Sequence, residues 1–141
     1  MRTRLPTGAQ WVLSPPGMAN GLHILAIDND PSVTTSLGWL FGPPRYRLDT
    51  GASGEAALAA VNAAAQPFDV IIVDQKMPDL TGAQVVAALR ERGLKSRIIV
   101  LSAHLTNELR KTYEDLDVQA IFEKPFDIAQ LRAAVDARPG A

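Results

Sequence analysis

Short apolar runs alternate with helix-forming segments along most of this chain, and this order constrains the fold more than any other feature. Residues 70–73 (VIIV) and 97–101 (RIIVL) are apolar at nearly every consecutive position. Such strands are covered on both faces, as in a parallel sheet with crossover helices. The strands that contain these runs are expected at residues 69–73 and 97–101, and further strands are expected at residues 23–27, 45–49 and 120–122. The pattern therefore predicts an α/β fold.

Five helical segments separate or follow these strands. They are expected at residues 32–41, 53–65, 82–92, 106–114 and 127–137. In the second, apolar residues recur at helical spacing, and Ser53 with Glu55 gives the acidic start that suits a helix dipole. In the third, Gly93 is expected to end the helix. Five strand and helix units fill the chain after residue 21 and leave no room for a second domain.

The chain has 141 residues, of which 47% are apolar, and this is enough for one packed domain. We expect that domain at residues 21–137, followed by a short C-terminal tail at residues 138–141. Residues 1–20 contain several Pro and Gly without periodicity, so a flexible N-terminal leader is expected there, and Met18 is an alternative natural start.

Charge and cysteine content exclude several functions. Fourteen basic and 15 acidic side chains give a net charge of -1, so no overall field favours nucleic acid or an anionic membrane. The chain has no cysteine, which excludes disulfides and thiolate metal sites and suits a reducing compartment. No segment resembles a signal peptide or a transmembrane helix. We therefore expect a cytoplasmic protein.

Polar residues close four of the predicted strands. The first strand ends at Asp28, the third at Asp74, the fourth at Ser102, and the fifth leads to Lys124. In an open parallel sheet, ligands bind beyond the carboxyl ends of the strands. Two carboxylates, a hydroxyl and an ammonium at one edge suit a hard cation and a phosphoryl group. This set indicates phosphoryl-transfer chemistry.

Each of these polar residues has a simpler interpretation when taken alone. Asp30, before Pro31, and Ser102 are both suited to cap the helix that follows. Asp74 opens the turn QKMPDLTG, where Asp commonly accepts hydrogen bonds from nearby amides. Lys124 taken alone is an ordinary surface lysine. These simple roles explain each residue taken alone, but they explain less well why all four residues close strands at one edge of the sheet.

Four motifs together resemble one family, the receiver domains of bacterial two-component response regulators. They are IDNDP, FDVIIVDQKMPDLTG, IIVLSAH and FEKPF, in this order between residues 21 and 137. The resemblance implies a doubly wound, flavodoxin-like sheet of five parallel strands in the order 2-1-3-4-5, with helices on both faces. It also implies a phosphorylation-dependent signalling switch rather than an enzyme.

By this resemblance, Asp74 is the phosphoacceptor, and Ser102 and Lys124 bind the phosphoryl group and switch with it. The bond between Lys124 and Pro125 is expected to be cis. Lys76 and His104 match two positions that tune dephosphorylation in similar proteins. The alternative is that either side chain is simply solvated and has no such role.

The implied cofactor is Mg²⁺, held by Asp28, Asn29, Asp74 and the backbone carbonyl of Lys76. Similar proteins usually have a second acid where this chain has Asn29. An amide oxygen still ligates but carries no charge, so we expect weaker Mg²⁺ binding.

The switch also departs from the family pattern. Similar proteins carry Tyr or Phe three residues before the lysine, where this chain has Ile121, with Phe122 next. Alternation along the strand predicts that Phe122 lies on the opposite side from Ile121, as a core residue.

The implied partners are a sensor histidine kinase or a histidine phosphotransfer protein. Output is expected through a partner or self-association on the face formed by the fourth helix, fifth strand and fifth helix. Two alternatives are a degenerate receiver that binds partners without phosphorylation, and a haloacid dehalogenase-type phosphatase. The phosphatase needs a further acidic metal motif after Lys124, where only Asp127 and Asp136 remain.

Overall fold

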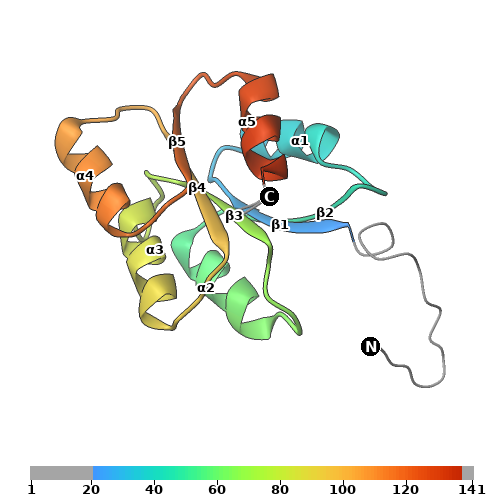
Figure 1. Ribbon diagram of the computed structural model, residues 1–141, viewed down its shortest axis with the longest axis horizontal. Helices are drawn as coiled ribbons and strands as arrows, with labels where there is room; N and C mark the ends of the chain where they lie inside the picture. Colours follow the sequence, from blue (N-terminus) through green and yellow to red (C-terminus); the bar gives the residue numbers. More distant parts are fainter. Residues whose placement is uncertain (1–20, 138–141) are drawn as a thin grey trace.

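Five parallel strands form the central sheet in the order β2-β1-β3-β4-β5, which confirms the predicted fold class (Figure 1). The computed structural model describes residues 21–137, so the expected leader and tail lie outside the described residues. The strands are β1 (Leu22–Ile27), β2 (Tyr46–Gly51), β3 (Val70–Asp74), β4 (Arg97–Ser102) and β5 (Ala120–Glu123).

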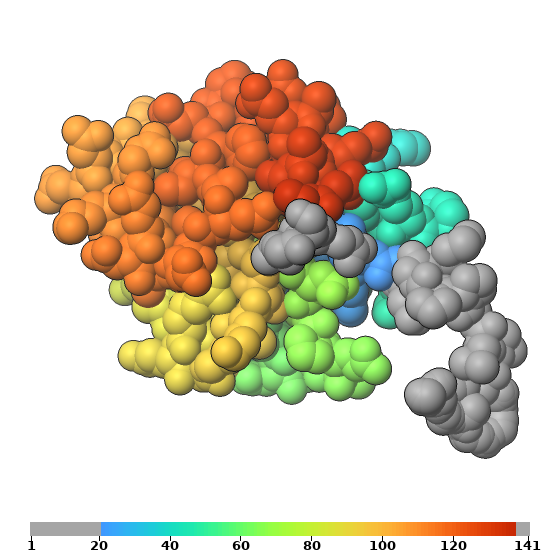
Figure 2. Space-filling model, in the orientation of Figure 1, coloured from blue at the N-terminus to red at the C-terminus, as the bar shows by residue number. Residues whose placement is uncertain are grey.

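Helices cover both faces of this sheet. They are α1 (Pro31–Leu40), α2 (Gly54–Ala63), α3 (Gly82–Glu91), α4 (Asn107–Asp115) and α5 (Ile128–Asp136). Helices α1 and α5 lie on one face, and α2, α3 and α4 lie on the other (Figure 1). Strand β5 lies between α4 and α5 in Figure 1, and this part of the chain forms the orange to red surface in Figure 2.

The helices begin one residue after a polar side chain that accepts a hydrogen bond from a backbone N–H of the first turn. These capping residues are Asp30, Ser53, Thr81, Thr106 and Asp127. The predicted helix bounds differ by a residue or two because they counted some caps as helical. Gly93, with φ of 77°, follows α3 in the left-handed conformation that favours glycine.

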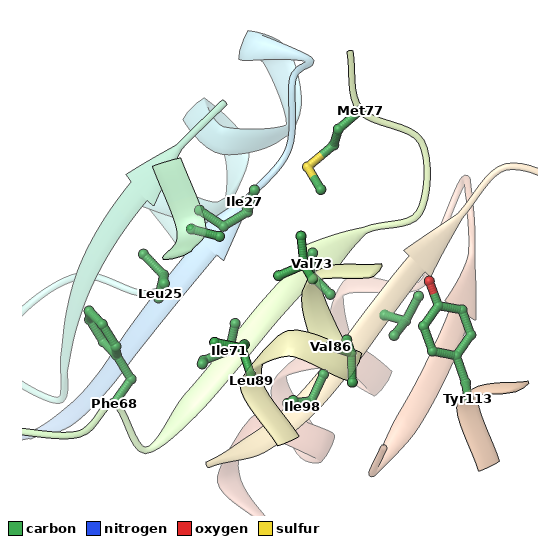
Figure 3. Packing of buried hydrophobic residues seen from close by; sticks show 13 residues of the cluster. Leu25, Ile27, Phe68, Ile71, Val73, Met77, Val86, Leu89, Ile98 and Tyr113 are labelled. Atoms are coloured by element: carbon green, nitrogen blue, oxygen red, sulfur yellow. The ribbon is translucent and has the colours of Figure 1, made fainter. Parts of the chain in front are cut away.

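The apolar strands separate two hydrophobic cores. On one face, alternate residues such as Leu25, Ile71 and Val73 pack with α2, α3 and α4, as Figure 3 shows in part. On the other face, residues such as Ile24 and Ile72 pack with α1 and α5. Strand β3 is buried along its whole length, as its continuous apolar sequence predicts.

No helix within residues 21–137 is both long and apolar enough to cross a membrane.

Candidate functional site

The register of the sheet brings four strand ends together. Ile27 pairs with Val73, so Asp28 follows β1 beside the position of Asp74 at the end of β3. Asp74 pairs with Leu101, the residue before Ser102. Ser102 in turn pairs with Glu123, the residue before Lys124. These parallel pairings place the four predicted residues at the carboxyl edge of β1, β3, β4 and β5.

Lys124 joins the two carboxylates of this edge. Its ammonium lies 2.8 Å from Asp28 Oδ2 and 3.2 Å from Asp74 Oδ1. The two aspartates are almost fully buried, with 1% and 5% exposure. The peptide bond between Lys124 and Pro125 is cis. Lys124 is therefore not the solvated surface lysine that the sequence left open.

Burial raises the pKa of the Asp74 carboxyl above its usual value, and the charge of Asp28 raises it further. Lys124 acts in the opposite direction. For Lys124 itself, burial lowers the pKa, but the hydrogen bond and charge of Asp28 and the charge of Asp74 outweigh it. Its pKa is therefore raised, and the lysine is a cation held between two carboxylates.

The hydroxyl of Ser102 is buried in the same edge, where the residue is 1% exposed. Within residues 21–137, its hydroxyl makes no hydrogen bond, although its carbonyl accepts one from the Lys124 amide at 2.9 Å. It does not cap α4, because Thr106 does so. A buried hydroxyl without a partner usually costs free energy, so this group is suited to a ligand at the site.

The loop after β1 divides the tasks of its polar residues. Asp28 Oδ1 accepts a hydrogen bond from the Asp30 amide at 2.9 Å. Asp30 Oδ1 accepts from the Ser32 amide at 2.9 Å and from its hydroxyl at 2.8 Å, so Asp30 caps α1. Asn29 is exposed, and its side chain has no hydrogen-bond partner among the described residues.

The predicted tuning and switch residues lie around this edge. Lys76 and His104 are both exposed in the loops after β3 and β4. Ile121 packs on the side of α2, α3 and α4, and Phe122 packs on the side of α1 and α5. The two residues therefore lie on opposite sides of the sheet, as alternation predicted.

Sequence reasoning missed Asp79 in the loop before α3. Its carboxylate accepts from the amides of Gly54 and Glu55 at 2.9 and 2.8 Å, at the start of α2. These bonds lower the pKa of Asp79. Its position in the PDL turn was the only sequence signal. Asp79 thus ties the loop between β3 and α3 to the start of α2.

A second missed contact joins Tyr113 of α4 to Gln75, the residue after Asp74. The Tyr113 hydroxyl donates to the Gln75 side-chain oxygen. Burial raises the pKa of the Tyr113 phenol far above its usual value, and the charge of Asp74 adds to this, so the phenol stays a donor. The spacing of Tyr113 from this loop gave no sequence signal.

The chemistry of this edge fits a hard divalent cation. Carboxylate and carbonyl oxygens are the ligands that Mg²⁺ prefers. Two nearly buried carboxylates share Lys124 here, and the buried Ser102 hydroxyl lies at the end of the neighbouring strand. Asp28, Asn29, Asp74 and the Lys76 carbonyl are the groups that would hold the ion.

The sheet order defines a doubly wound α/β domain of the flavodoxin-like class, and the acidic carboxyl edge lies where sheets of this class bind ligands. The model of the response regulator receiver domain matches residues 24–136, and the chain belongs to this family. It is thus a signalling domain of the two-component type. The phosphatase alternative loses support, because Asp127 caps α5 and Asp136 pairs with Arg45.

Curated relatives include transcriptional regulators and a phosphotransferase. Transcriptional regulatory protein KdpE of Mycobacterium tuberculosis is 34% identical over 116 residues, which cover 79% of this chain and 50% of KdpE. Sporulation initiation phosphotransferase F of Bacillus subtilis is 26% identical, over 79% of this chain and 89% of that protein. The chain spans about half the length of KdpE and only 25% of a putative transcriptional regulator of Haloferax volcanii.

Solved receiver domains have the same fold. The receiver domain of Francisella response regulator 1452 superposes with a TM-score of 0.75 and 25% identity, covering 82% of this chain and 94% of that one. Chemotaxis response regulator CheY4 of Vibrio cholerae has a TM-score of 0.72 and 26% identity, covering 82% and 99%.

Proposed function

We propose that this domain is a phosphorylation-activated switch that accepts a phosphoryl group on Asp74. The observation that carries the proposal is the Lys124 ammonium held between Asp28 and Asp74, at the same edge as the buried hydroxyl of Ser102, which has no hydrogen-bond partner within residues 21–137. The phosphodonor is the phosphohistidine of a sensor histidine kinase or of a histidine phosphotransfer protein. The domain acts in the cytoplasm and contacts neither nucleic acid nor membrane.

In this mechanism, an Asp74 carboxylate oxygen attacks the phosphorus of the donor. The new O–P bond forms as the P–N bond to the histidine breaks, and the imidazole leaves with its electron pair. Lys124 then pairs with the phosphoryl oxygens, and the Ser102 hydroxyl donates to one of them. Bound Mg²⁺ supplies positive charge that offsets the charge of the phosphoryl oxygens.

Hydrolysis of the acyl phosphate later returns the domain to its resting state. The exposed side chains of Lys76 and His104 flank the site and are suited to tune this step. Output passes through a partner or self-association on the face of α4, β5 and α5. Ile121, at the switch position of β5, is aliphatic, so an aromatic residue does not report phosphorylation from that position.

One observation favours a second function. Asn29 brings no charge to the loop after β1, and its side chain is exposed. A domain that binds the cation weakly could serve as a phosphorylation-independent binding module.

Intact-mass measurement after incubation with Mg²⁺ and acetyl phosphate tests the proposal. We expect a gain of one phosphoryl group in the wild type and none in Asp74→Asn, with an unchanged fold by circular dichroism. Labelling that persists in Asp74→Asn would move the acceptor to Asp28. No labelling of the wild type would favour the binding module, and repeated turnover of simple phosphate esters would favour the phosphatase.

A further inference from the structure

Helix α4 is attached to the rest of the domain by one fully buried side chain. Tyr113 is 0% exposed and is the only buried residue of α4. Leu109 of α4 and Leu116 just after it are only partly buried against the same core. Because burial of a large aromatic side chain dominates the packing of a short helix, the position of α4 depends mainly on Tyr113.

The hydroxyl of Tyr113 lies at the loop that follows Asp74. Figure 3 shows its hydroxyl directed toward the end of the sheet where Met77 lies and away from Phe68. There it donates to the side chain of Gln75, directly after Asp74. The Gln75 backbone is held on two sides, since its amide donates to Leu101 at 2.8 Å and its carbonyl accepts from Gly82 at 2.8 Å.

Gly82 leaves the space that the hydroxyl needs. A Cβ at this position would lie 2.7 Å from the Tyr113 hydroxyl and 2.7 Å from the Asp74 carbonyl oxygen. Both distances are shorter than van der Waals contact allows. The start of α3, the end of β3 and Tyr113 of α4 are therefore packed so closely that position 82 has no space for a Cβ.

We propose that Tyr113 is a positioning residue that couples the phosphorylation state of Asp74 to the attachment of α4. This inference rests on the proposed function. A phosphoryl group adds about one unit of negative charge and three acceptor oxygens to the residue that precedes Gln75. Any shift of Gln75 that makes room for this group moves the acceptor of the Tyr113 hydroxyl. Helix α4 then moves or loosens with its one buried residue.

Fluorine NMR of the protein with 3-fluorotyrosine in place of tyrosine tests this coupling. The chain has two tyrosines, Tyr46 and Tyr113, so two resonances are expected, and Tyr46→Phe and Tyr113→Phe assign them. Tyr46 is a matched control, because it is also buried, with 3% exposure, and its hydroxyl donates to Asp136 at 2.8 Å on the opposite face of the sheet. The probe is acetyl phosphate with Mg²⁺, and intact mass is measured on the same sample.

With a gain of one phosphoryl group, we expect the Tyr113 resonance to shift and the Tyr46 resonance to stay in place. Hydrogen exchange of residues 107–115 should change on phosphorylation in the wild type and in Tyr46→Phe. In Tyr113→Phe, which keeps the ring and loses only the hydroxyl, this phosphorylation-dependent difference should be lost although labelling persists. A merely structural hydroxyl would alter exchange equally with and without the phosphoryl group.

Three results would overturn the inference, and they distinguish the coupling from the proposed function. A mass gain with an unmoved Tyr113 resonance, or with the same exchange difference in Tyr113→Phe as in the wild type, refutes the coupling and leaves the proposed function intact. The absence of any mass gain in the wild type refutes the proposed function and the coupling with it.

Discussion

Replacement of Lys124 by methionine is expected to destabilise the metal-free domain. The wild-type ammonium lies 2.8 Å from Asp28 and 3.2 Å from Asp74, and both carboxylates are nearly buried. Methionine keeps most of the apolar stem of lysine and adapts easily to its surroundings, so the substitution removes chiefly the charge. Two buried carboxylates are then left to repel each other.

The size of the effect follows from the exposure of the lysine. Removal of one partner from a fully buried ion pair costs about 3–5 kcal/mol. The Lys124 side chain is 23% exposed, and water screens part of the interaction, so we expect about 2–3 kcal/mol. At about 4 °C per kcal/mol for a domain of this size, the thermal midpoint should fall by about 8–12 °C.

Calorimetry and urea unfolding at neutral pH in chelator measure this change. Lys95→Met is the matched control, since it makes the same substitution at an exposed position and should leave the midpoint nearly unchanged. Addition of Asp28→Asn to Lys124→Met should restore part of the lost stability by removing one of the two repelling charges. If Lys124→Met has the same thermal midpoint as Lys95→Met, the ammonium does not stabilise the buried carboxylates, and the electrostatic account of this edge is wrong.

Three further predictions concern other parts of the domain. Asn29→Asp should bind Mg²⁺ about ten- to a hundredfold more tightly in titrations and melt lower in chelator, because it adds a third carboxylate; equal affinities would show that residue 29 does not meet the ion. Gly82→Ala should lower the free energy of unfolding in urea by about 1–3 kcal/mol, because its Cβ would clash with a carbonyl and a phenol. Gly38→Ala is the control and should stabilise α1 by about 0.5–1 kcal/mol, because nothing lies within 4 Å of its Cβ. Similar effects of both substitutions would contradict the crowding at Gly82. Burial raises the pKa of Tyr113, so above pH of about 10, where unfolded tyrosine ionises, its proton stays bound only in the fold. Stability should therefore fall with rising pH by up to about 1.4 kcal/mol per unit, and Tyr113→Phe should remove this part of the slope in urea unfolding at pH of about 9–11.

Local patterns in the sequence were enough to predict the architecture. Continuous apolar runs such as VIIV predict strands covered on both faces, and alternation with helical segments predicts a parallel sheet, because both rules depend on near neighbours. The position of Asp74, Ser102 and Lys124 at strand ends follows from the same patterns. Their assembly at one edge then follows from the parallel arrangement, which aligns the carboxyl ends of all strands. The four family motifs indicated the same class of protein.

The contacts between these groups could not be predicted from local sequence patterns. Lys124 meets Asp28 across 96 residues of sequence, and Tyr113 meets Gln75 across 38. Neither contact has a local signal, because it depends on strand register and on the angle at which α4 packs. The same holds for Asp79, whose turn motif is local but whose partners lie at the start of α2. Local sequence patterns thus account for the sheet and for the polar residues at its edge, whereas packing between distant segments sets how these residues pair and how α4 contacts the loop after Asp74.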